Sequence, residues 1–468
     1  MKAPEASANP SRPSLRGAHA ADLGGADWTR RQFVSGLTRS AAGAALLSGG
    51  PAALAASVEK MSRPTLDKAN HSTPPRRKKI AFLTTEVRKY SHAQQFLDRF
   101  LEGYGWRGQH YHPSIEVAGL YVDQIPEGDL SRDRARRHGV KIYPSVEEAL
   151  TLGRSHLAVD GVVIIAEHGL YPRTEKGQTL YPRHQFFQRA VKVFEDSGRA
   201  VPVFNDKHLS TDWKECVAMV QAARRLGFPF LAGSSLPVTW RIPPVEVPLQ
   251  APLAESVCVG YGGLDAYDIH GLETAQCMSE RRAGGETGVR SVQAVRGPKV
   301  WQILAERDNT QRLFFAALTR SFTCKGLEKY PGALPDLPWL RKHHKTPVAY
   351  FVEHLDGFQT SLFLLNGLVA DFNYAGLLGN GGQIVSCQMY LPMPPALATV
   401  ADFFNPLVHH IEQMILDNAA PYPVERTLLT SGMTLFALES LYRGQVPLPT
   451  PELKVSYLPP QRSCFWRA

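Results

Sequence analysis

The alternation of short apolar runs with amphipathic segments between residues 79 and 235 is the feature that most constrains the fold. The clearest apolar run is Gly161–Ala166, and shorter runs occupy 80–83 and 115–122. Runs of this kind are typical of strands that are buried on both faces of a parallel sheet. Segments with apolar residues at helical spacing separate the runs, and 213–226 is a clear example. We therefore predict a doubly wound, Rossmann-like parallel sheet in which the first run lies in the middle, between the other two.

The pattern changes after about residue 240, where strand-like segments follow one another with short turns. These segments are 289–295, 346–353, 359–365, 368–375 and 384–391, and helical patterns cover 263–282, 403–416 and 423–443. Sequential strands with short connections favour antiparallel pairing. We therefore expect residues 79–235 to form a Rossmann-like domain, and residues 236–468 to form an α+β domain with a large, mostly antiparallel sheet.

The N-terminal segment has the pattern of an export signal. Two arginines in Thr29–Val34 (TRRQFV) precede a weakly apolar run, which ends in the small-x-small pattern Ala53–Ala55. A basic tail or a single membrane helix are the other readings, but the run is too short and too rich in Gly and Ser to span a bilayer well. We predict that residues 1–55 are a twin-arginine signal peptide and 56–78 a linker. The twin-arginine translocase would then deliver the protein to the periplasm, or otherwise out of the cytoplasm, with no membrane attachment after cleavage.

Charge and cysteine content limit the classes of partner. The net charge is +9, but the first 55 residues carry six basic and three acidic side chains, so the remaining chain is only mildly basic. Such an excess does not indicate nucleic-acid binding. The six cysteines form no C-x-x-C pair, which argues against a zinc clip or thioredoxin-like chemistry. A protein that folds in a reducing compartment before export is also expected to contain few disulfides.

Four local segments resemble motifs of one known family. They are Asp160–His168, Val203–His208, His270–Glu273 and Val424–Val446. In this order they resemble the fourth strand and following loop, the "EKP" segment, the H-x-x-D helix start and the terminal helix of the Gfo/Idh/MocA family of sugar and cyclitol oxidoreductases. The resemblance covers about residues 79–450 at a diverged level. It implies hydride transfer from a sugar carbinol to nicotinamide, and some members of this family leave the cytoplasm by the twin-arginine route.

The phosphate-binding loop departs from the family. A dinucleotide fold needs Gly-x-Gly-x-x-Gly after the first strand, so that the backbone can approach the pyrophosphate. Here Thr84, Glu86 and Lys89 occupy the glycine positions. The Glu86 carboxylate would repel the pyrophosphate at a cost of several kcal/mol, and Arg88 offsets the charge without restoring the backbone geometry. Asp123 follows the second strand, where it could grip a ribose hydroxyl or simply end a turn.

The candidate site is the crevice beyond the C-terminal ends of the parallel strands. The candidates for catalysis are Lys207, His270, Glu273, His168 and Asp268, and those for cofactor contact are Thr84, Glu86, Arg88, Asp123 and Glu167. The resemblance implies that Lys207 orients the substrate and shares its proton, that His270 is the general base and that Asp268 orients His270. Acid–base work would suit a lysine whose pKa is lowered towards neutrality by its surroundings.

Three functions remain open at this point. The first is an exported oxidoreductase-type enzyme that acts on a sugar, cyclitol or glycoside with a degenerate NAD(P) site. The second is a nicotinamide-free lyase, hydratase or hydrolase on carbohydrate, with a divalent metal possible at His168, His208, His270 and Glu273. The third is a non-catalytic carbohydrate-binding protein. It would use aromatic residues of the second half, namely Tyr330, Trp339, Tyr350, Tyr374 and Tyr390.

The family resemblance also bears on assembly. Members of the family often pair through the open face of the large sheet, and the segments 359–365 and 368–375 have apolar faces that would suit such pairing. We therefore expect a homo-oligomer to be possible, either a dimer or a tetramer.

Overall fold

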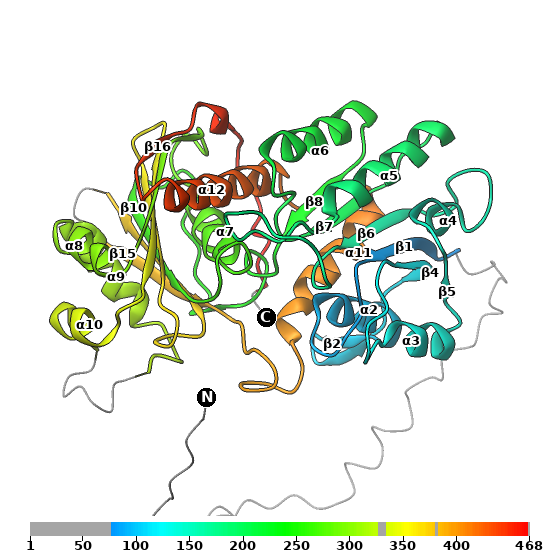
Figure 1. Cartoon of the computed structure of the whole chain (residues 1–468), viewed down its shortest axis with the longest axis horizontal. Coiled ribbons are helices and arrows are strands. Elements are labelled where there is room, and N and C mark those ends of the chain that lie inside the picture. The colour runs from blue at the N-terminus through cyan, green and yellow to red at the C-terminus, as the bar shows by residue number, and fades with distance from the viewer. Residues whose placement is uncertain (1–75, 326–333, 380–381, 467–468) are drawn as a thin grey trace, which may run out of the picture. The chain divides into compact units, whose positions relative to one another are not determined.

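Two sheets organise the residues that the computed structural model describes, which are 76–325, 334–379 and 382–466 (Figure 1). The predicted signal peptide and nearly all of the predicted linker lie outside these residues. None of the helices within the described ranges is long and apolar enough to cross a membrane.

The first sheet has six strands in the order β5-β4-β1-β6-β7-β8. Their bounds are Lys78–Thr84 (β1), Ile115–Val122 (β4), Lys141–Ile142 (β5), Gly161–Ile165 (β6), Val203–Asp206 (β7) and Phe230–Gly233 (β8). All five neighbouring pairs are parallel, and β1 lies between β4 and β6. The predicted Rossmann-like sheet, with its central first strand, is therefore confirmed.

Helices cover both faces of this sheet because its strands are apolar on both sides. They are His92–Glu102 (α2), Ser131–His138 (α3), Val146–Thr151 (α4), Arg183–Ser197 (α5) and Trp213–Leu226 (α6). Ile80 and Phe82 belong to the core on the α2 side, whereas Ala81 and Leu83 belong to the core that α4, α5 and α6 complete. The bounds of α6 follow from local chemistry, since the Asp212 side chain accepts a hydrogen bond from the Glu215 backbone N–H at its start.

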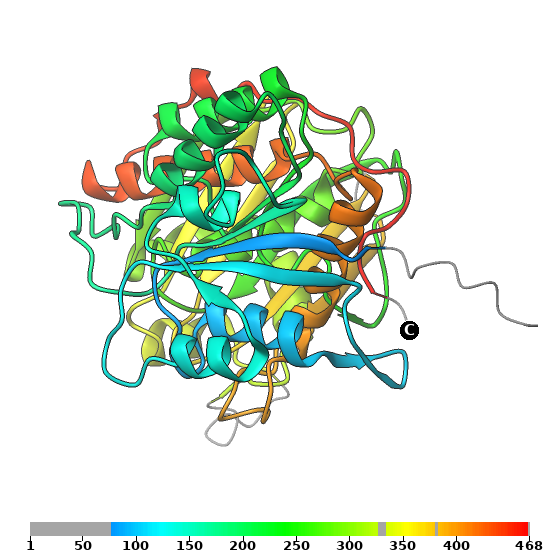
Figure 2. The same cartoon turned by 90° about the vertical axis from the view of Figure 1, so that its right-hand side faces the viewer.

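A helix from the C-terminal part of the chain completes the α2 side. Helix α11 (Asn405–Asp417) lies beside β1, and Lys78 Nζ donates to the carbonyl oxygens of Ile415 and Leu416 at 2.6 and 2.9 Å (Figure 2). A Cβ atom on Gly161 in β6 would approach Ile415 to 2.8 Å, so only glycine allows this close contact. The helices that cover the first sheet thus come from both halves of the sequence.

The second sheet has eight strands in the order β16-β11-β12-β13-β10-β14-β15-β9. Their bounds are Arg241–Ile242 (β9), Leu253–Gly260 (β10), Val289–Arg296 (β11), Val348–His354 (β12), Gln359–Leu364 (β13), Phe372–Leu378 (β14), Ile384–Met389 (β15) and Leu448–Pro449 (β16). Strands β10 and β13 pair in parallel, and the other neighbours pair antiparallel. The mostly antiparallel sheet is as predicted. A small hairpin, Tyr104–Trp106 (β2) with Gln109–Tyr111 (β3), stands apart from both sheets.

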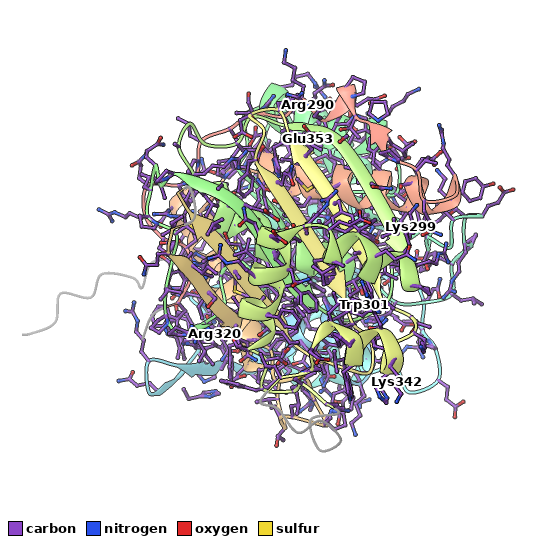
Figure 3. The ribbon with its side chains drawn as sticks, turned by 90° about the vertical axis from the view of Figure 1, so that its left-hand side faces the viewer. Arg290, Lys299, Trp301, Arg320, Lys342 and Glu353 are labelled. Carbon is purple, nitrogen blue, oxygen red and sulfur yellow. The ribbon has the colours of Figure 1, made fainter. Side chains whose placement is uncertain are left out.

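Helices also cover both faces of the second sheet. Asp268–Ser279 (α7) and Glu425–Tyr442 (α12) lie between the two sheets in Figure 1. Pro298–Ala305 (α8), Asp308–Leu318 (α9) and Leu337–His343 (α10) cover the outer face, which Figure 3 shows from the front.

The sequence analysis did not predict this outer layer of helices. Trp301 of α8 and Phe314 of α9 share a buried core with Val257, Phe363 and Ala375 of the strands beneath them. The apolar faces that the sequence analysis assigned to pairing between subunits are therefore filled by helices of the same chain.

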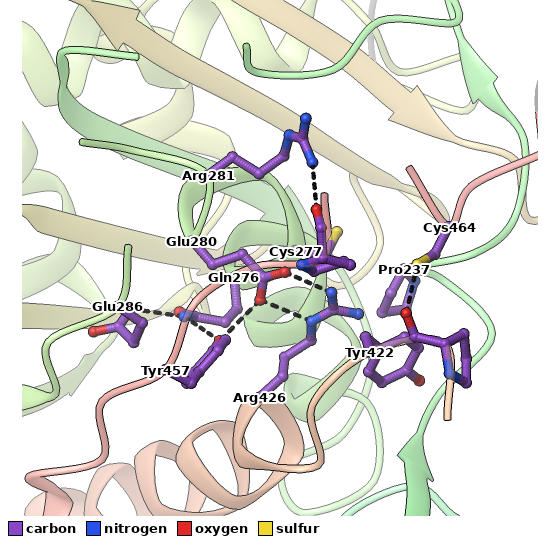
Figure 4. A network of polar contacts seen from close by, with 12 residues as sticks. Pro237, Gln276, Cys277, Glu280, Arg281, Glu286, Tyr422, Arg426, Tyr457 and Cys464 are labelled. Atoms are coloured by element: carbon purple, nitrogen blue, oxygen red, sulfur yellow. Dashed lines mark hydrogen bonds and ion pairs between the residues drawn. The ribbon is translucent and has the colours of Figure 1, made fainter. Parts of the chain in front are cut away.

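A buried ionic network fixes α7 against α12 (Figure 4). Arg426 donates to both carboxylate oxygens of Glu280, at 2.8 and 2.5 Å, and the hydroxyl of Tyr457 donates to the same carboxylate at 2.8 Å. Gln276 donates to Glu286 and Tyr457 at 2.7 and 2.8 Å. Charge-assisted, bidentate contacts of this kind fix geometry strongly. They hold in place the helix that carries His270.

Candidate functional site

The C-terminal ends of β1, β6 and β7 and the start of α7 bring charged side chains into contact. The Lys207 ammonium, after β7, forms an ion pair with Glu167, after β6, and also donates to the carbonyl oxygen of Ala266 at 3.1 Å. Both charged side chains are buried, with exposed fractions of 2% and 8%. A pair this far from water is held by its own attraction and by hydrogen bonds rather than by solvent.

The ion pair sets the protonation of both groups. Burial alone would lower the pKa of Lys207, but the charges of Glu167 and Asp206 outweigh it and raise this pKa above its ordinary value. Burial likewise disfavours the Glu167 carboxylate, and the Lys207 charge reverses the effect and lowers its pKa. Lys207 therefore stays an ammonium and Glu167 a carboxylate. The expectation that surroundings lower the lysine pKa towards neutrality is wrong.

A second pair lies next to the first. His92, at the start of α2, places Nδ1 2.7 Å from a carboxylate oxygen of Asp206 and 4.0 Å from Glu167. With Nδ1 engaged by Asp206, Nε2 is the ring nitrogen that can serve a substrate. His92 and Asp206 are not among the catalytic and cofactor candidates that the sequence predicts, although Asp206 directly precedes one of them, Lys207.

The four residues considered as metal ligands are not brought together. His208 Nε2 lies 3.3 Å from Asp265, whereas Glu273 accepts hydrogen bonds from the Ser234 N–H at 2.6 Å and the Thr427 hydroxyl at 3.2 Å. In the part of the chain that the structure describes, one group has metal-like spacing, and it is His92, Glu167 and Asp206, with ligand atoms within 4.8 Å of one another. Lys207 compensates one of the two carboxylate charges in that group, the one on Glu167.

A small cavity lies beside His92 of the second pair. His92, Tyr267, His270, Leu391 and Phe404 are among the residues that line its volume of about 40 Å³. This volume holds only one or two water molecules. A larger ligand can therefore enter only if residues of the lining move.

Lys207 and His270 reach the same aromatic ring. Lys207 Nζ lies 5.6 Å from the centroid of Tyr267, and the ring centroids of Tyr267 and His270 are 5.6 Å apart. Burial, and then the Lys207 charge, lower the pKa of His270 far below its ordinary value, so this imidazole is neutral. Its Nδ1 atom is buried without a hydrogen-bond partner among the described residues.

The backbone is strained at the same place. Tyr90, His168, Lys207 and Asp265 have φ angles of 66°, 71°, 62° and 65°, in the left-handed region that side chains other than glycine rarely adopt. Such conformations persist only where the surrounding structure fixes them, and they cluster at functional sites. They support a specialised role for this crevice.

Asp268 and Glu273 lie deeper than the cavity. The Asp268 carboxylate accepts hydrogen bonds from the Tyr350 hydroxyl at 2.8 Å and from the backbone N–H of Ile269 at 2.9 Å. It does not bond to His270. Burial raises the pKa of Asp268 and of Glu273 to about 7. Both side chains act here as internal supports of α7.

The predicted cofactor residues tie the loop after β1 to the loop after β6. The hydroxyl of Thr84 donates to the Ile165 carbonyl at 2.9 Å. Arg88 pairs with the buried Glu86 at 2.6 Å and reaches Nδ1 of His168 at 3.0 Å. Side chains thus fill the space that a glycine-rich loop would leave to a pyrophosphate.

The position expected for a ribose is also engaged. Both carboxylate oxygens of Asp123 accept hydrogen bonds, one from the Tyr121 hydroxyl at 2.7 Å and one from the Tyr171 hydroxyl at 2.6 Å. Together with the buried Glu86, these contacts show that the residues present do not fit a dinucleotide bound in the usual manner of this fold.

Comparisons with known proteins give only distant likeness. No protein-family model matches the chain, and no curated protein shows a significant sequence match. Similar solved structures include GenD2 from gentamicin A biosynthesis in complex with NAD, at 13% identity and a TM-score of 0.48, covering 81% of this chain and 97% of that one. A myo-inositol dehydrogenase from Lactobacillus casei in complex with NAD(H) and myo-inositol has 12% identity, a TM-score of 0.46, and coverage of 80% and 97%. A probable dehydrogenase from Thermotoga maritima has 11% identity, a TM-score of 0.49, and coverage of 80% and 99%.

Proposed function

We propose that this chain is an exported, Gfo/Idh/MocA-like enzyme that moves protons on a sugar, a cyclitol or a related polyhydroxy compound without using nicotinamide. The observation that carries the proposal is the pairing of a charged Lys207 with Glu167 beside the His92–Asp206 pair, whose His92 lines a small cavity. Elimination or addition of water is the reaction class that suits this arrangement best, because it needs no oxidant.

The charge state of each group would determine its role in the reaction. His92, held by Asp206 through Nδ1, would take a proton from the substrate through Nε2. The Lys207 ammonium would stabilise negative charge that develops on a substrate oxygen, which is the largest single contribution in many enzymes. The neutral His270, which also lines the cavity, would exchange a second proton.

The state of the dinucleotide position favours this proposal over a redox enzyme. A hydride acceptor would have to displace the Tyr171 hydroxyl from Asp123 and approach the carboxylate of Glu86. Each step costs free energy that a glycine-rich loop would not demand. An NAD(P)-dependent oxidoreductase is the alternative that the following experiment distinguishes.

The experiment is turnover in D2O with and without added NAD(P)⁺. The full chain is incubated with a panel of sugars, cyclitols and their keto and acid derivatives, and NMR records deuterium uptake at carbon and loss of water. We expect turnover that does not depend on NAD(P)⁺, that is lost in His92→Gln and Lys207→Met, and that is unchanged in His156→Gln, a substitution at an exposed histidine.

Two outcomes would contradict the proposal. Turnover that requires NAD(P)⁺ would show that the enzyme is an oxidoreductase. An equimolar amount of nicotinamide bound to protein purified from its native compartment would support the same conclusion. Binding of a sugar with no turnover of any compound would favour the non-catalytic carbohydrate-binding protein instead.

A further inference from the structure

A large groove runs along the outside of α2, separate from the small cavity. It has a volume of about 1450 Å³ and is lined by α2, the β2–β3 hairpin, residues 399–405 and the C-terminal Trp466. A volume of this size is larger than most pockets for single small ligands. The proposed reaction at the cavity makes no use of it.

Aromatic side chains form much of the wall of this groove. Trp106 and Trp466 lie with ring centroids 4.1 Å apart, and Arg107 lies over Trp466 at 4.9 Å. Trp106 itself is buried, with an exposed fraction of 7%. The aromatic surface of the groove therefore comes from the half-buried Trp466 and Trp240 and from Tyr90, which is 42% exposed. Aromatic surfaces of this kind suit a ligand with flat, weakly polar C–H surfaces.

Charged side chains of both signs lie between the aromatic ones. Lys89, Arg99 and Arg107 are balanced by Asp98, Glu102 and Asp402. The Arg99 guanidinium is already bonded to Asn405 at 2.6 Å and to Gln95 at 2.8 and 2.9 Å. The groove therefore lacks the one-sided positive charge that a polyanion such as nucleic acid would need.

Unpartnered polar atoms point to a hydrogen-bonding ligand. Tyr104 lines the groove and is only 5% exposed, yet its hydroxyl has no hydrogen-bond partner within the described ranges. One carboxylate oxygen of Asp402 also has no hydrogen-bond partner among the described residues, and its other oxygen lies 3.3 Å from the Tyr390 hydroxyl. Buried polar groups are normally satisfied, so atoms left without a partner call for a ligand or ordered water.

The groove adjoins the cavity. Tyr90 and Gln95 line both, and the segment from Leu391 to Phe404 contributes Leu391 and Phe404 to the cavity and Val400 to the groove. A ligand that lies in the groove can therefore place one end against the wall of the cavity.

We propose that the groove binds an uncharged oligosaccharide, which packs against Trp240 and Trp466 and bonds to Tyr104 and Asp402, with one end directed past Tyr90 to the cavity. Aromatic faces, balanced charge and unpartnered hydrogen-bonding atoms are the combination that a neutral, hydroxyl-rich chain requires. The inference deepens the proposed function and rests on it only for the identity of the reacting end.

The test is calorimetric titration of the full chain with cello-, xylo- and malto-oligosaccharides of one to six units. We expect affinity for at least one series to rise with length. We also expect Trp466→Ala to weaken binding of the longest member at least tenfold, about 1.4 kcal/mol, with an unchanged circular dichroism spectrum. Phe322→Ala, at an exposed aromatic residue outside the groove, should leave affinity unchanged.

Calorimetric binding needs no turnover, so oligosaccharide binding can be found even if no compound is ever turned over and the proposed function fails. Absence of binding by all three series, affinity that does not depend on length, or equal affinities of the unaltered chain and Trp466→Ala would each overturn the proposal.

Discussion

The hydroxyl of Tyr171 donates a hydrogen bond of 2.6 Å to Asp123, the carboxylate that follows the second parallel strand of the first sheet. In a dinucleotide-binding protein of this fold, an acidic residue at that position receives the ribose. In this chain Tyr171, from the loop after β6, and Tyr121 are the partners of that carboxylate.

We predict weak binding of free nicotinamide dinucleotides as a consequence. Titration calorimetry of the unaltered chain with NAD⁺ and NADP⁺ should give dissociation constants of about 1 mM or weaker, equivalent to at most about 4 kcal/mol. Adding glycines through Thr84→Gly with Glu86→Gly should not restore affinity, because the contacts at Asp123 remain. Micromolar binding by the unaltered chain would refute the argument.

The buried ion pair should dominate local stability. Lys207→Met leaves the Glu167 carboxylate buried and unpaired, and we expect this to lower the free energy of unfolding by about 3–5 kcal/mol. Urea unfolding measures the change, and a second substitution, Glu167→Leu, should recover much of it. Lys192→Met, which breaks an exposed pair with Asp196, should leave stability almost unchanged. Equal effects at the two lysines would contradict the assigned burial.

Asp268 should make stability depend on pH. Its pKa is about 7 in the folded protein because it is buried, whereas the ordinary value is 3.8. Between these values the folded chain holds a proton that the unfolded chain has lost. The stability that the protonated group contributes at low pH is therefore lost as pH rises from about 4 to 7, by about 1.4 kcal/mol per pH unit.

Asp268→Asn should remove this pH dependence. Urea unfolding at several pH values should show that the variant gains on the unaltered chain as pH rises, by on the order of 4 kcal/mol in total. Asp417→Asn at an exposed carboxylate is the control. Parallel pH profiles for the unaltered chain and Asp268→Asn would show that Asp268 is ionised in the folded state.

The helical layer on the second sheet should be required for stability. Phe314 of α9 is fully buried against the strands, and Phe314→Ala should cost about 3–5 kcal/mol in the free energy of unfolding. Phe322, which is 73% exposed, gives a matched control in Phe322→Ala. If Phe314→Ala loosens the layer, sedimentation should also reveal self-association through the uncovered sheet. A change no larger than that of the control would mean that α9 is not part of the core.

Export by the twin-arginine route remains a prediction from the sequence. A reporter fused to residues 1–60 should reach the periplasm only in cells with an intact twin-arginine translocase. Replacing both arginines, Arg30→Lys with Arg31→Lys, should stop it, because the receptor reads the pair. Continued export by the general secretory route would defeat the prediction.

Much of the fold could be predicted because local signals agreed with the tertiary structure. The helix at Trp213–Leu226 was placed correctly, since Asp212 caps its start and Gly227, with a φ of 69°, ends it. The central strand β10 was missed because Glu255 and Ser256 interrupt its apolar pattern. In the structure Glu255 accepts a hydrogen bond from Thr310 of α9, a partner that no local pattern reveals.

The site could be predicted only to the level of its segments. Parallel strands end at a common edge, so the segments that carry Glu167 and Lys207 were expected to meet. Which of these side chains form pairs depends on where the folded backbone directs them, and the left-handed backbone at Lys207 is one example. The pairing of His92 could not be predicted either, because its partner Asp206 lies 114 residues further along the chain. The pKa of Lys207 was predicted to shift in the wrong direction because the shift depends on direct pairing with Glu167, which the sequence does not reveal.

The position of β10 in the second sheet has a consequence for how the chain can be made. β10 lies between β13 and β14, both of which follow it in the sequence after β11, β12 and the three outer helices. During synthesis its two edges stay open until the ribosome has delivered these later strands, and open edges of this kind promote aggregation. A nascent chain that stops before Leu378 would therefore expose the centre of its own sheet, so the second sheet can close only after β14 has been synthesised.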